Sequence, residues 1–318
     1  MEEKILGIDL GGTYCRIGMV GNDNRVYHPH IISSECITRN GNIIKDLCEV
    51  IKNYIRKNQI IPLALAIGVP GSVTADHQTV YCAPNLKDAQ GRRLLDNVNL
   101  GERLQEEIGI PVYVNKDTNY LLYYDREYFQ LFDKNIIVSC YIGTGLGGSV
   151  MLNNEILQGK NGMAMDIGHI SFYHSRSVCN CGKYGCAETH ASGRVLRCLW
   201  KKNFSDEDFE NIFVKYSNTK IIKEFIYSCA LIVSVLGTIF TPEAYVLGGG
   251  VVEMKGFPRQ EFEHCLRELL GRAATAGDYR IYYSEKSKIK GVVGAAIFAR
   301  GKIKYDCSSV SLVKPNDI

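Results

Sequence analysis

Three cysteines and three histidines lie within one short stretch of the chain, residues 168–190, which reads GHISFYHSRSVCNCGKYGCAETH. Its cysteines, Cys179, Cys181 and Cys186, have the spacing C-x-C-x4-C, and His169 lies ten residues before the first of them. Three thiolates and one imidazole make the closed tetrahedral shell that structural zinc takes, whereas a catalytic zinc keeps one position open for water. The spacing therefore indicates a structural zinc site.

Other interpretations of the same stretch are weaker. On chemistry alone, His174 and His190 are alternative fourth ligands. A nucleic-acid-binding zinc finger would be richer in Lys and Arg around its ligands. A cysteine-rich loop without metal remains the alternative to a zinc site, although the set is close to known zinc spacings.

Glycine-rich turns follow three apolar, strand-like segments: DLGGT at 9–13, GTGLGG at 143–148 and LGGG at 247–250. Glycine lets backbone N–H groups approach an anion without obstruction by a Cβ, which is how a phosphate cradle works. GTGLGG also matches G-x-G-x-x-G, but the residues after it alternate like a strand, whereas the dinucleotide fingerprint requires a helix. No G-x-x-x-x-G-K-[ST] occurs, which excludes a P-loop. The pattern predicts a nucleotide held between two β-hairpin loops.

Two aspartates lie beside such strand ends. Asp9 begins the first glycine turn. Its carboxylate would repel a phosphate there unless a magnesium ion lay between them, so Asp9 indicates such an ion. The alternative is that Asp9 is an ordinary turn residue. Asp117, in VNKDTN, follows the strand-like 112–114 and precedes a helix-like segment. It is a candidate general base for transfer to a hydroxyl, and by spacing alone it could equally be a helix N-cap.

The elements that must position these residues alternate along the chain, which predicts an α/β fold. Apolar spacing predicts helices at 43–55, about 100–109, near 258–274 and at 291–304. Two further helices are expected, one that begins near 117 and another that ends at about 240. Strands are expected at 4–10, 15–20, 63–69, 112–114, 135–143, 244–250 and 280–284, with a hairpin at 148–157.

Composition indicates a soluble, cytoplasmic protein of two domains. The chain has 318 residues, 46% of them hydrophobic, and 37 basic against 34 acidic residues in a mixed distribution. No basic block suggests nucleic-acid binding. The longest apolar stretch, 225–240, is shorter than the roughly 20 residues of a membrane span, so we expect a buried helix and no membrane partner. The N-terminus lacks a signal-peptide pattern, and the scattered remaining cysteines suit a reducing compartment.

Five motifs occur in the order and approximate spacing of the ROK family of sugar kinases and related repressors: GIDLGGTYCRIG, VNKDTN, YIGTGLGG, GMAMDIGHI and CNCGKYGCAE. The chain resembles this family over nearly its whole length. The resemblance implies an actin-like (ribonuclease H-like) kinase fold whose two α/β domains close on ATP and a hexose. It places the N-terminal domain at 1–115, joined by the C-terminal helix at about 291–305, and the C-terminal domain with the zinc loop at 116–290.

The resemblance also assigns roles to individual residues. Asp117 would be the general base, and His169 the fourth zinc ligand. Asp9 would hold magnesium through the phosphates. The ATP-binding and phosphate-binding residues would be Asp9, Gly11, Gly12, Thr13, Gly143, Thr144, Gly145, Gly147, Gly148, Gly248 and Gly249. The sugar-binding residues would be Asn85, Lys116, Asp117, Asp166, His169 and Glu188. Without the resemblance, Asn85 would be a turn residue and Glu188 a surface carboxylate.

Three positions depart from the family pattern. Asp166 stands where the sugar segment usually has Glu, Lys116 where Asn usually precedes the base, and Tyr14 where a basic residue usually follows GGT. Lys116 resembles the basic residue of the D-allose kinase branch. Since Asp166 and Lys116 fall where sugar hydroxyls would be read, the leading hypothesis is phosphorylation of D-allose to D-allose 6-phosphate. Kinases for glucose, N-acetylmannosamine or fructose remain alternatives.

Two other classes of protein fit the sequence less well. A related repressor would carry a helix-turn-helix before the first strand, but that strand begins at Lys4. A non-catalytic sugar sensor would be expected to lose the base or the phosphate loops, and both are present. The resemblance implies a homo-oligomer, such as a dimer. The aromatic-rich stretches 120–132 and 279–284 are interpreted as core and interface packing.

Overall fold

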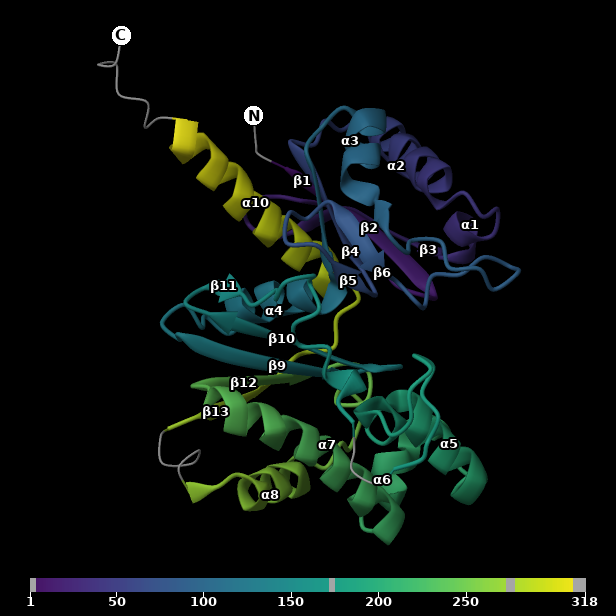
Figure 1. Ribbon diagram of the computed structural model, residues 1–318, viewed down its shortest axis with the longest axis vertical. Coiled ribbons are helices and arrows are strands. Elements are labelled where there is room, and N and C mark those ends of the chain that lie inside the picture. Colours follow the sequence, from purple (N-terminus) through teal and green to yellow (C-terminus); the bar gives the residue numbers. More distant parts are fainter. Residues whose placement is uncertain (1–3, 172–174, 273–277, 311–318) are drawn as a thin grey trace. The chain divides into compact units, whose positions relative to one another are not determined.

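The computed structural model describes residues 4–171, 175–272 and 278–310, of which 304–310 are described by their backbone alone (Figure 1). The chain divides into two compact units. Unit 1 comprises Met1–Glu127, Gln158–Met163 and Ser287–Ile318, and unit 2 comprises Tyr128–Leu157 and Ala164–Lys286. The domain boundaries expected from the sequence, at 115/116 and 290/291, stay a prediction.

Unit 1 is built on a five-stranded mixed sheet in the order β3-β2-β1-β4-β8. The strands are β1 Ile5–Leu10, β2 Tyr14–Val20, β3 Val26–Ser33, β4 Ala64–Val69 and β8 Val112–Lys116. The first three pair antiparallel, whereas β4 and β8 run parallel to β1. Side chains alternate between the two faces of a strand, so Leu65 and Ile67 enter one core while Ala64 and Ala66 enter another. A sheet covered on both faces explains why β4 is apolar throughout.

Helices cover both faces of this sheet. On one face α2 Ile43–Asn58 and α3 Leu100–Ile108 are capped by Asn42 and Asn99, whose side chains accept N–H bonds from the first turn. On the other face α10 Lys290–Val310 packs against β1 and β4 with its small residues (Figure 1). Gly294 is required there, because a Cβ would collide with the carbonyl of Tyr120 in α4 Asp117–Tyr128.

Smaller elements complete unit 1. The short helix α1 Glu35–Thr38 follows β3, and a three-stranded sheet is formed by β5 Ser72–Val73, β6 Thr79–Cys82 and β7 Val98–Asn99. The excursion 158–163 lies against it, where Gly162 at φ +66° approaches the backbone of Val73.

Unit 2 also has a five-stranded mixed sheet, in the order β11-β10-β9-β12-β13. Its strands are β9 Ile136–Ile142, β10 Leu146–Leu152, β11 Glu155–Ile156, β12 Ala244–Gly248 and β13 Arg280–Tyr283. The first three form the predicted hairpins, and β12 runs parallel to both β9 and β13. Parallel strands end at the same edge of a sheet, so the glycine turns after β9 and β12 are brought together.

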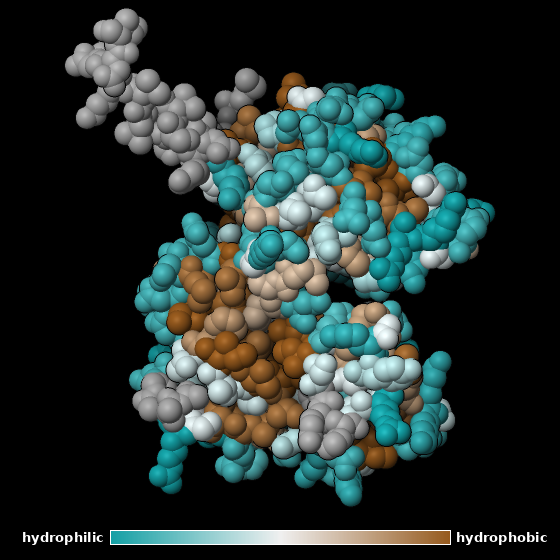
Figure 2. Space-filling model, viewed as in Figure 1, coloured by the Kyte–Doolittle hydropathy of each residue, from teal (hydrophilic) through white to brown (hydrophobic). Residues whose placement is uncertain are grey.

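The helices of unit 2 are α5 Gly193–Asn203, α6 Ile212–Tyr216, α7 Lys220–Phe240 and α8 Arg259–Leu269, with single 3₁₀ turns η1 Ile167–His169, η2 Ala187–Thr189 and η3 Phe209–Asn211. By length and composition alone α7 could cross a membrane, but 56% of its most apolar window is buried. It packs with α8 against the sheet as a core helix (Figure 1). Figure 2 shows apolar surface on this face of unit 2, in the region of α7, β12 and β13.

The expected elements are largely present, but several others were not predicted: the short helices α1 and α6, the small sheet of β5, β6 and β7, and the two longer elements β3 and α5. The strand β3 was not predicted, because VYHPHIIS carries Pro and two His; Pro29 is tolerated since only β2 pairs with β3 among the described residues. The helix α5 was not predicted, although Ser192 caps it and the buried Leu196 marks an apolar side. The helix expected near 258–274 ends at Leu269, and part of that range, 273–277, lies outside the described residues.

Candidate active site and zinc centre

The four predicted zinc ligands come together in unit 2. The ligand atoms of His169, Cys179, Cys181 and Cys186 all lie within 4.8 Å of one another. Sγ of Cys181 and Sγ of Cys186 are 3.6 Å apart, and Sγ of Cys179 is 3.6 Å from Nδ1 of His169. A tetrahedral ion with Zn–S bonds of about 2.3 Å would separate two sulfurs by roughly 3.8 Å. The donor set and its spacing therefore fit zinc.

The two alternative fourth ligands, His174 and His190, are not part of this cluster of described ligand atoms. His190 lies with Nε2 at 2.7 Å from the Ser175 hydroxyl, and no geometry is described for His174, which lies outside the described residues. The cluster joins two segments, because His169 ends η1 and Cys186 immediately precedes η2. The N–H of Ala187 donates to the carbonyl of Ile170 (2.8 Å), which holds these segments side by side. A closed four-ligand cluster at this point would be structural and would fix the residues next to it.

Glu188, in η2, is one of those residues. Its carboxylate accepts a hydrogen bond from the N–H of Leu146 (3.0 Å) and forms an ion pair with Arg194. The side chain is only 14% exposed and lies directly against Gly145. Glu188 is therefore not an ordinary surface carboxylate. Arg194 was not predicted from the sequence, where its one signal is a cation next to a glycine, six residues after Glu188.

The two glycine turns of unit 2 lie together at the ends of parallel strands. The N–H of Gly143 donates to the carbonyl of Gly145 (3.0 Å), closing the turn between β9 and β10. Gly249, at φ +89°, packs its backbone on Ile142, where a Cβ would come within 2.7 Å of three backbone atoms. Of the other predicted phosphate-binding glycines, Gly147 and Gly148 belong to β10 and Gly248 ends β12.

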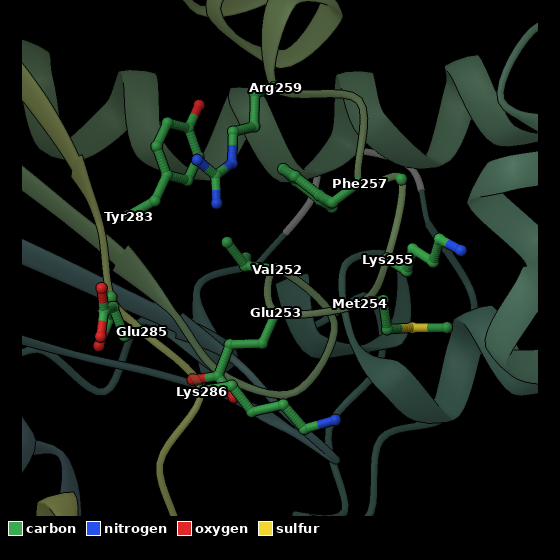
Figure 3. A pocket seen from close by; sticks show the side chains of 11 residues that line it. Val252, Glu253, Met254, Lys255, Phe257, Arg259, Tyr283, Glu285 and Lys286 are labelled. Carbon is green, nitrogen blue, oxygen red and sulfur yellow. The ribbon is translucent and has the colours of Figure 1, made fainter.

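A pocket of about 580 Å³ is lined by residues 252–257 after β12, by Arg259 and by residues 283–286 at the end of β13 (Figure 3). The guanidinium of Arg259 lies over the ring of Tyr283, with Cζ 4.2 Å from the ring centroid. The Tyr283 hydroxyl donates to Glu263 (2.9 Å). Charged side chains of both signs, among them Lys255 and Lys286, line the pocket. Its place at the carboxyl edge of a parallel strand pair is where α/β sheets bind ligands.

The first glycine turn, residues 9–13, belongs to unit 1, and its backbone is hydrogen-bonded to Ser34, which lies outside the turn. Ser34 donates through its hydroxyl to the carbonyl of Gly11 (2.6 Å), and its N–H donates to the carbonyl of Thr13 (2.9 Å). Gly12 lies beside Asn85, whose backbone oxygen would be 3.4 Å from a Cβ on that glycine. Tyr14, which follows the turn, is half exposed.

Asp9 precedes this turn at the end of β1. Burial raises the pKa of its carboxyl, and an ion pair with Arg16 at 3.1 Å opposes that rise. A carboxylate held beside a glycine turn supplies the oxygen ligand that magnesium takes, with phosphate and water completing the shell. The residues present thus fit a magnesium–phosphate group.

Asp117 lies where β8 passes into α4 and is the first residue of that helix. Burial, and then the charge of Asp9, raise the pKa of Asp117 to about 6; Lys116 and the N–H of Thr118 oppose the rise. That N–H donates to Oδ1 of Asp117 at 2.7 Å. Asn115, not predicted from the sequence as a site residue, is buried, and its side-chain oxygen accepts a hydrogen bond from the Asn119 side chain (2.8 Å), which stabilises the start of α4.

The predicted sugar-binding residues fall in both units. Asn85, Lys116 and Asp117 belong to unit 1, whereas Asp166, His169 and Glu188 belong to unit 2. Asp166 directly precedes η1, and its carbonyl accepts from the N–H of His169 (3.0 Å). The roles of these residues stay predictions.

The architecture defines a two-unit α/β protein with mixed five-stranded sheets, glycine turns at strand ends and a Cys₃His cluster in unit 2. The model of the ROK family matches residues 5–302, and the chain therefore belongs to the ROK family.

Relatives of this chain include both kinases and repressors. The glucokinase of Thermotoga maritima is 24% identical over 322 residues, covering 94% of this chain and 98% of that protein. The xylose repressor of Caldicellulosiruptor bescii is 26% identical over 310 residues, covering 90% of this chain and 75% of that protein. The crystal structure of a ROK family glucokinase from Streptomyces griseus, in complex with glucose and AMPPNP, has a TM-score of 0.76 at 23% identity and covers 94% and 99% of the two chains. This structural match confirms the predicted actin-like α/β fold.

Proposed function

We propose that this protein is an ATP-dependent hexose kinase that uses Asp117 as its general base. The observation that carries the proposal is the environment of Asp117, where burial and Asp9 raise the pKa to about 6. A base that accepts a hydroxyl proton works best when its pKa lies near the operating pH. An aspartate at a helix start would ordinarily titrate well below that value and would need no such environment.

In the proposed reaction, Asp117 accepts the proton of a sugar hydroxyl as the hydroxyl oxygen bonds to the γ-phosphorus and the bond to ADP breaks. Lys116 lowers the pKa of Asp117 and helps to keep it ionised before the transfer. Asp9 would hold a magnesium ion through the phosphates; the ion neutralises phosphate charge. The glycines at 11, 12, 143, 145, 147, 148, 248 and 249, with Thr13 and Thr144, would surround the phosphates.

The substrate assignment remains D-allose, with glucose, N-acetylmannosamine and fructose as alternatives. It rests on Lys116 and Asp166, which replace the residues usual in the family where hydroxyls are read. Asn85, His169 and Glu188 would contact the remaining hydroxyls. A structural zinc on the Cys₃His cluster would hold His169 and Glu188 in place.

A sugar-responsive regulator is the second candidate, favoured by the match to the C. bescii xylose repressor. Such a protein binds sugar without phosphoryl transfer, so it has no need of a base with a raised pKa.

We also propose a homodimer in the cytoplasm. On α7, Tyr227 and Ile239 are 48% and 63% exposed, and the partly buried Leu231 and Val235 lie between them at helical spacing. An apolar stripe of this kind on a core helix suits contact with a second copy. Sedimentation of the purified protein would measure the oligomeric state directly.

The proposed function is tested by an ADP-release assay with magnesium-ATP and a panel of aldohexoses and fructose. The matched variants are Asp117→Asn and, as a control, Asp133→Asn, since Asp133 is exposed and its ion pair is with Lys134. Sugar-dependent turnover that Asp117→Asn abolishes and Asp133→Asn retains would support the kinase. Fastest turnover of D-allose would support the substrate, and preference for another hexose would overturn that part alone. Sugar binding without turnover would favour the regulator.

A further inference from the structure

The start of α5 is bound to the glycine turn between β9 and β10. Ser192 caps the helix by accepting from the N–H of Val195 (3.4 Å). The next two N–H groups donate to the turn: that of Gly193 to the carbonyl of Gly143 (2.8 Å), and that of Arg194 to the carbonyl of Thr144 (3.3 Å). The backbone of Arg194 is therefore fixed relative to the turn proposed to bind phosphate.

The side chain of Arg194 returns toward the zinc loop. Its Nη2 pairs with Oε1 of Glu188, while Oε2 of Glu188 accepts from the N–H of Leu146 (3.0 Å). Both oxygens of the carboxylate are thus bonded, by groups from α5 and from β10. Gly145 closes the remaining side, because a Cβ there would collide with Oε2.

These contacts fix the orientation of the Glu188 side chain, which the zinc cluster alone does not fix. The cluster fixes the backbone at Cys186, two residues before Glu188, but a glutamate side chain still has three torsions free to rotate. Nη2 of Arg194 binds Oε1 while the N–H of Leu146 binds Oε2, so donors at both oxygens fix the orientation of the carboxylate. A lysine ammonium would supply the charge as a point donor without the planar guanidinium. Arg194 is 38% exposed and Glu188 14%, so the pair is partly shielded from water and contributes more than an exposed ion pair would.

We propose that Arg194 is a positioning residue for sugar binding, acting through Glu188. It holds the Glu188 carboxylate in one orientation between the zinc loop and the 143–148 turn, so that the carboxylate is preorganised for sugar hydroxyls. This inference rests on the proposed function for the role of Glu188 as a sugar-binding group. Arg194 itself contacts neither the sugar nor the phosphates.

The test is a double-mutant cycle with Arg194→Gln, Glu188→Gln and the double variant, with sugar affinity measured by calorimetry in the full-length, zinc-loaded protein. We expect Arg194→Gln to weaken sugar binding at least tenfold and to leave the KM for magnesium-ATP within twofold. The double variant should bind sugar no more weakly than the weaker single variant, because both changes remove one interaction. Arg194→Lys should recover part of the loss, and Lys201→Gln, an exposed cation on the same helix, should have no effect.

Several outcomes would overturn the proposal. The losses of sugar affinity in the two single variants could multiply in the double variant, and the KM for ATP could rise with them. That result would show that Arg194 contacts phosphate. Unchanged sugar affinity in Arg194→Gln would show that the ion pair is incidental. Loss of zinc in that variant but not in Arg194→Lys would show a purely structural role. Calorimetry needs no turnover, so sugar binding that depends on Arg194 in a protein without kinase activity would support this inference and refute the proposed function.

Discussion

Replacing Asp117 by Asn should stabilise the protein while removing its activity. The pKa of Asp117 is raised from 3.8 to about 6, mainly by burial and then by Asp9, so the folded protein disfavours the ionised carboxyl. That difference corresponds to about 3 kcal/mol of unfolding free energy lost at pH 8, as an upper estimate. Asn has no charge and keeps an oxygen for the N–H of Thr118. The variant should therefore gain up to about 3 kcal/mol at pH 8.

The stability gained by Asp117→Asn should depend on pH in a direction set by the raised pKa of Asp117. Between pH 3.8 and 6 the folded protein binds more protons at Asp117 than the unfolded chain does, so the stability contributed by this group falls as the pH rises through that window. The gain from Asp117→Asn should consequently be largest at pH 8 and about half as large at pH 5. His77, whose pKa burial lowers to about 4, titrates in both proteins and cancels in the difference.

The assay is urea unfolding of the ligand-free wild type and variant at pH 5 and pH 8, with ADP release measured on the same samples. Activity should fall by about 10²–10⁴-fold, the usual contribution of a general base. The control is Asp133→Asn, because bonding to Lys134 lowers the pKa of Asp133 and its removal cannot stabilise the protein at pH 8. A gain in stability that is equal at both pH values, or a loss at pH 8, would refute the reasoning.

Three further predictions concern the zinc loop, a glycine and the pH profile. Cys181→Ser should lower the bound zinc, measured by atomic absorption against the wild type; an unchanged content would exclude Cys181 as a ligand. Gly145→Ala should raise the sugar KM at least about fivefold, since its Cβ would displace Glu188, whereas Gly301→Ala, with open space around it, should not; equal KM values would contradict the contact. The value of kcat/KM should rise with pH through about 6, because Asp117 must be ionised to accept a proton, and a flat profile from pH 5 to 7 would rule out this base.

Much of the fold was predictable because its determinants are local in the chain. The apolar spacing at 43–55 and the continuous apolar run at 63–69 predict α2 and β4, which the structure confirms. The strand β3 could not be predicted in the same way, since it exists through pairing with β2 and not through its own composition. The helix α5 differs, because its Ser192 cap and its one-sided apolar residues are local signals that the sequence analysis missed; hydrogen bonds to a turn about 50 residues earlier in the chain then fix its start.

The sequence by itself predicted a cluster of Cys179, Cys181 and Cys186 with a histidine, for which the family resemblance chose His169, and it predicted the glycine turns. Cysteine spacing restricts the geometry a metal can impose, and a glycine after a strand permits close backbone approach whatever surrounds it. Tertiary structure decided the rest. The raised pKa of Asp117 arises from burial and from Asp9, more than 100 residues away in the chain, and the bonding of Glu188 joins Leu146 and Arg194 from two other elements. Desolvation and charge–charge interactions depend on distances in space, and no spacing along a sequence fixes those before the chain has folded.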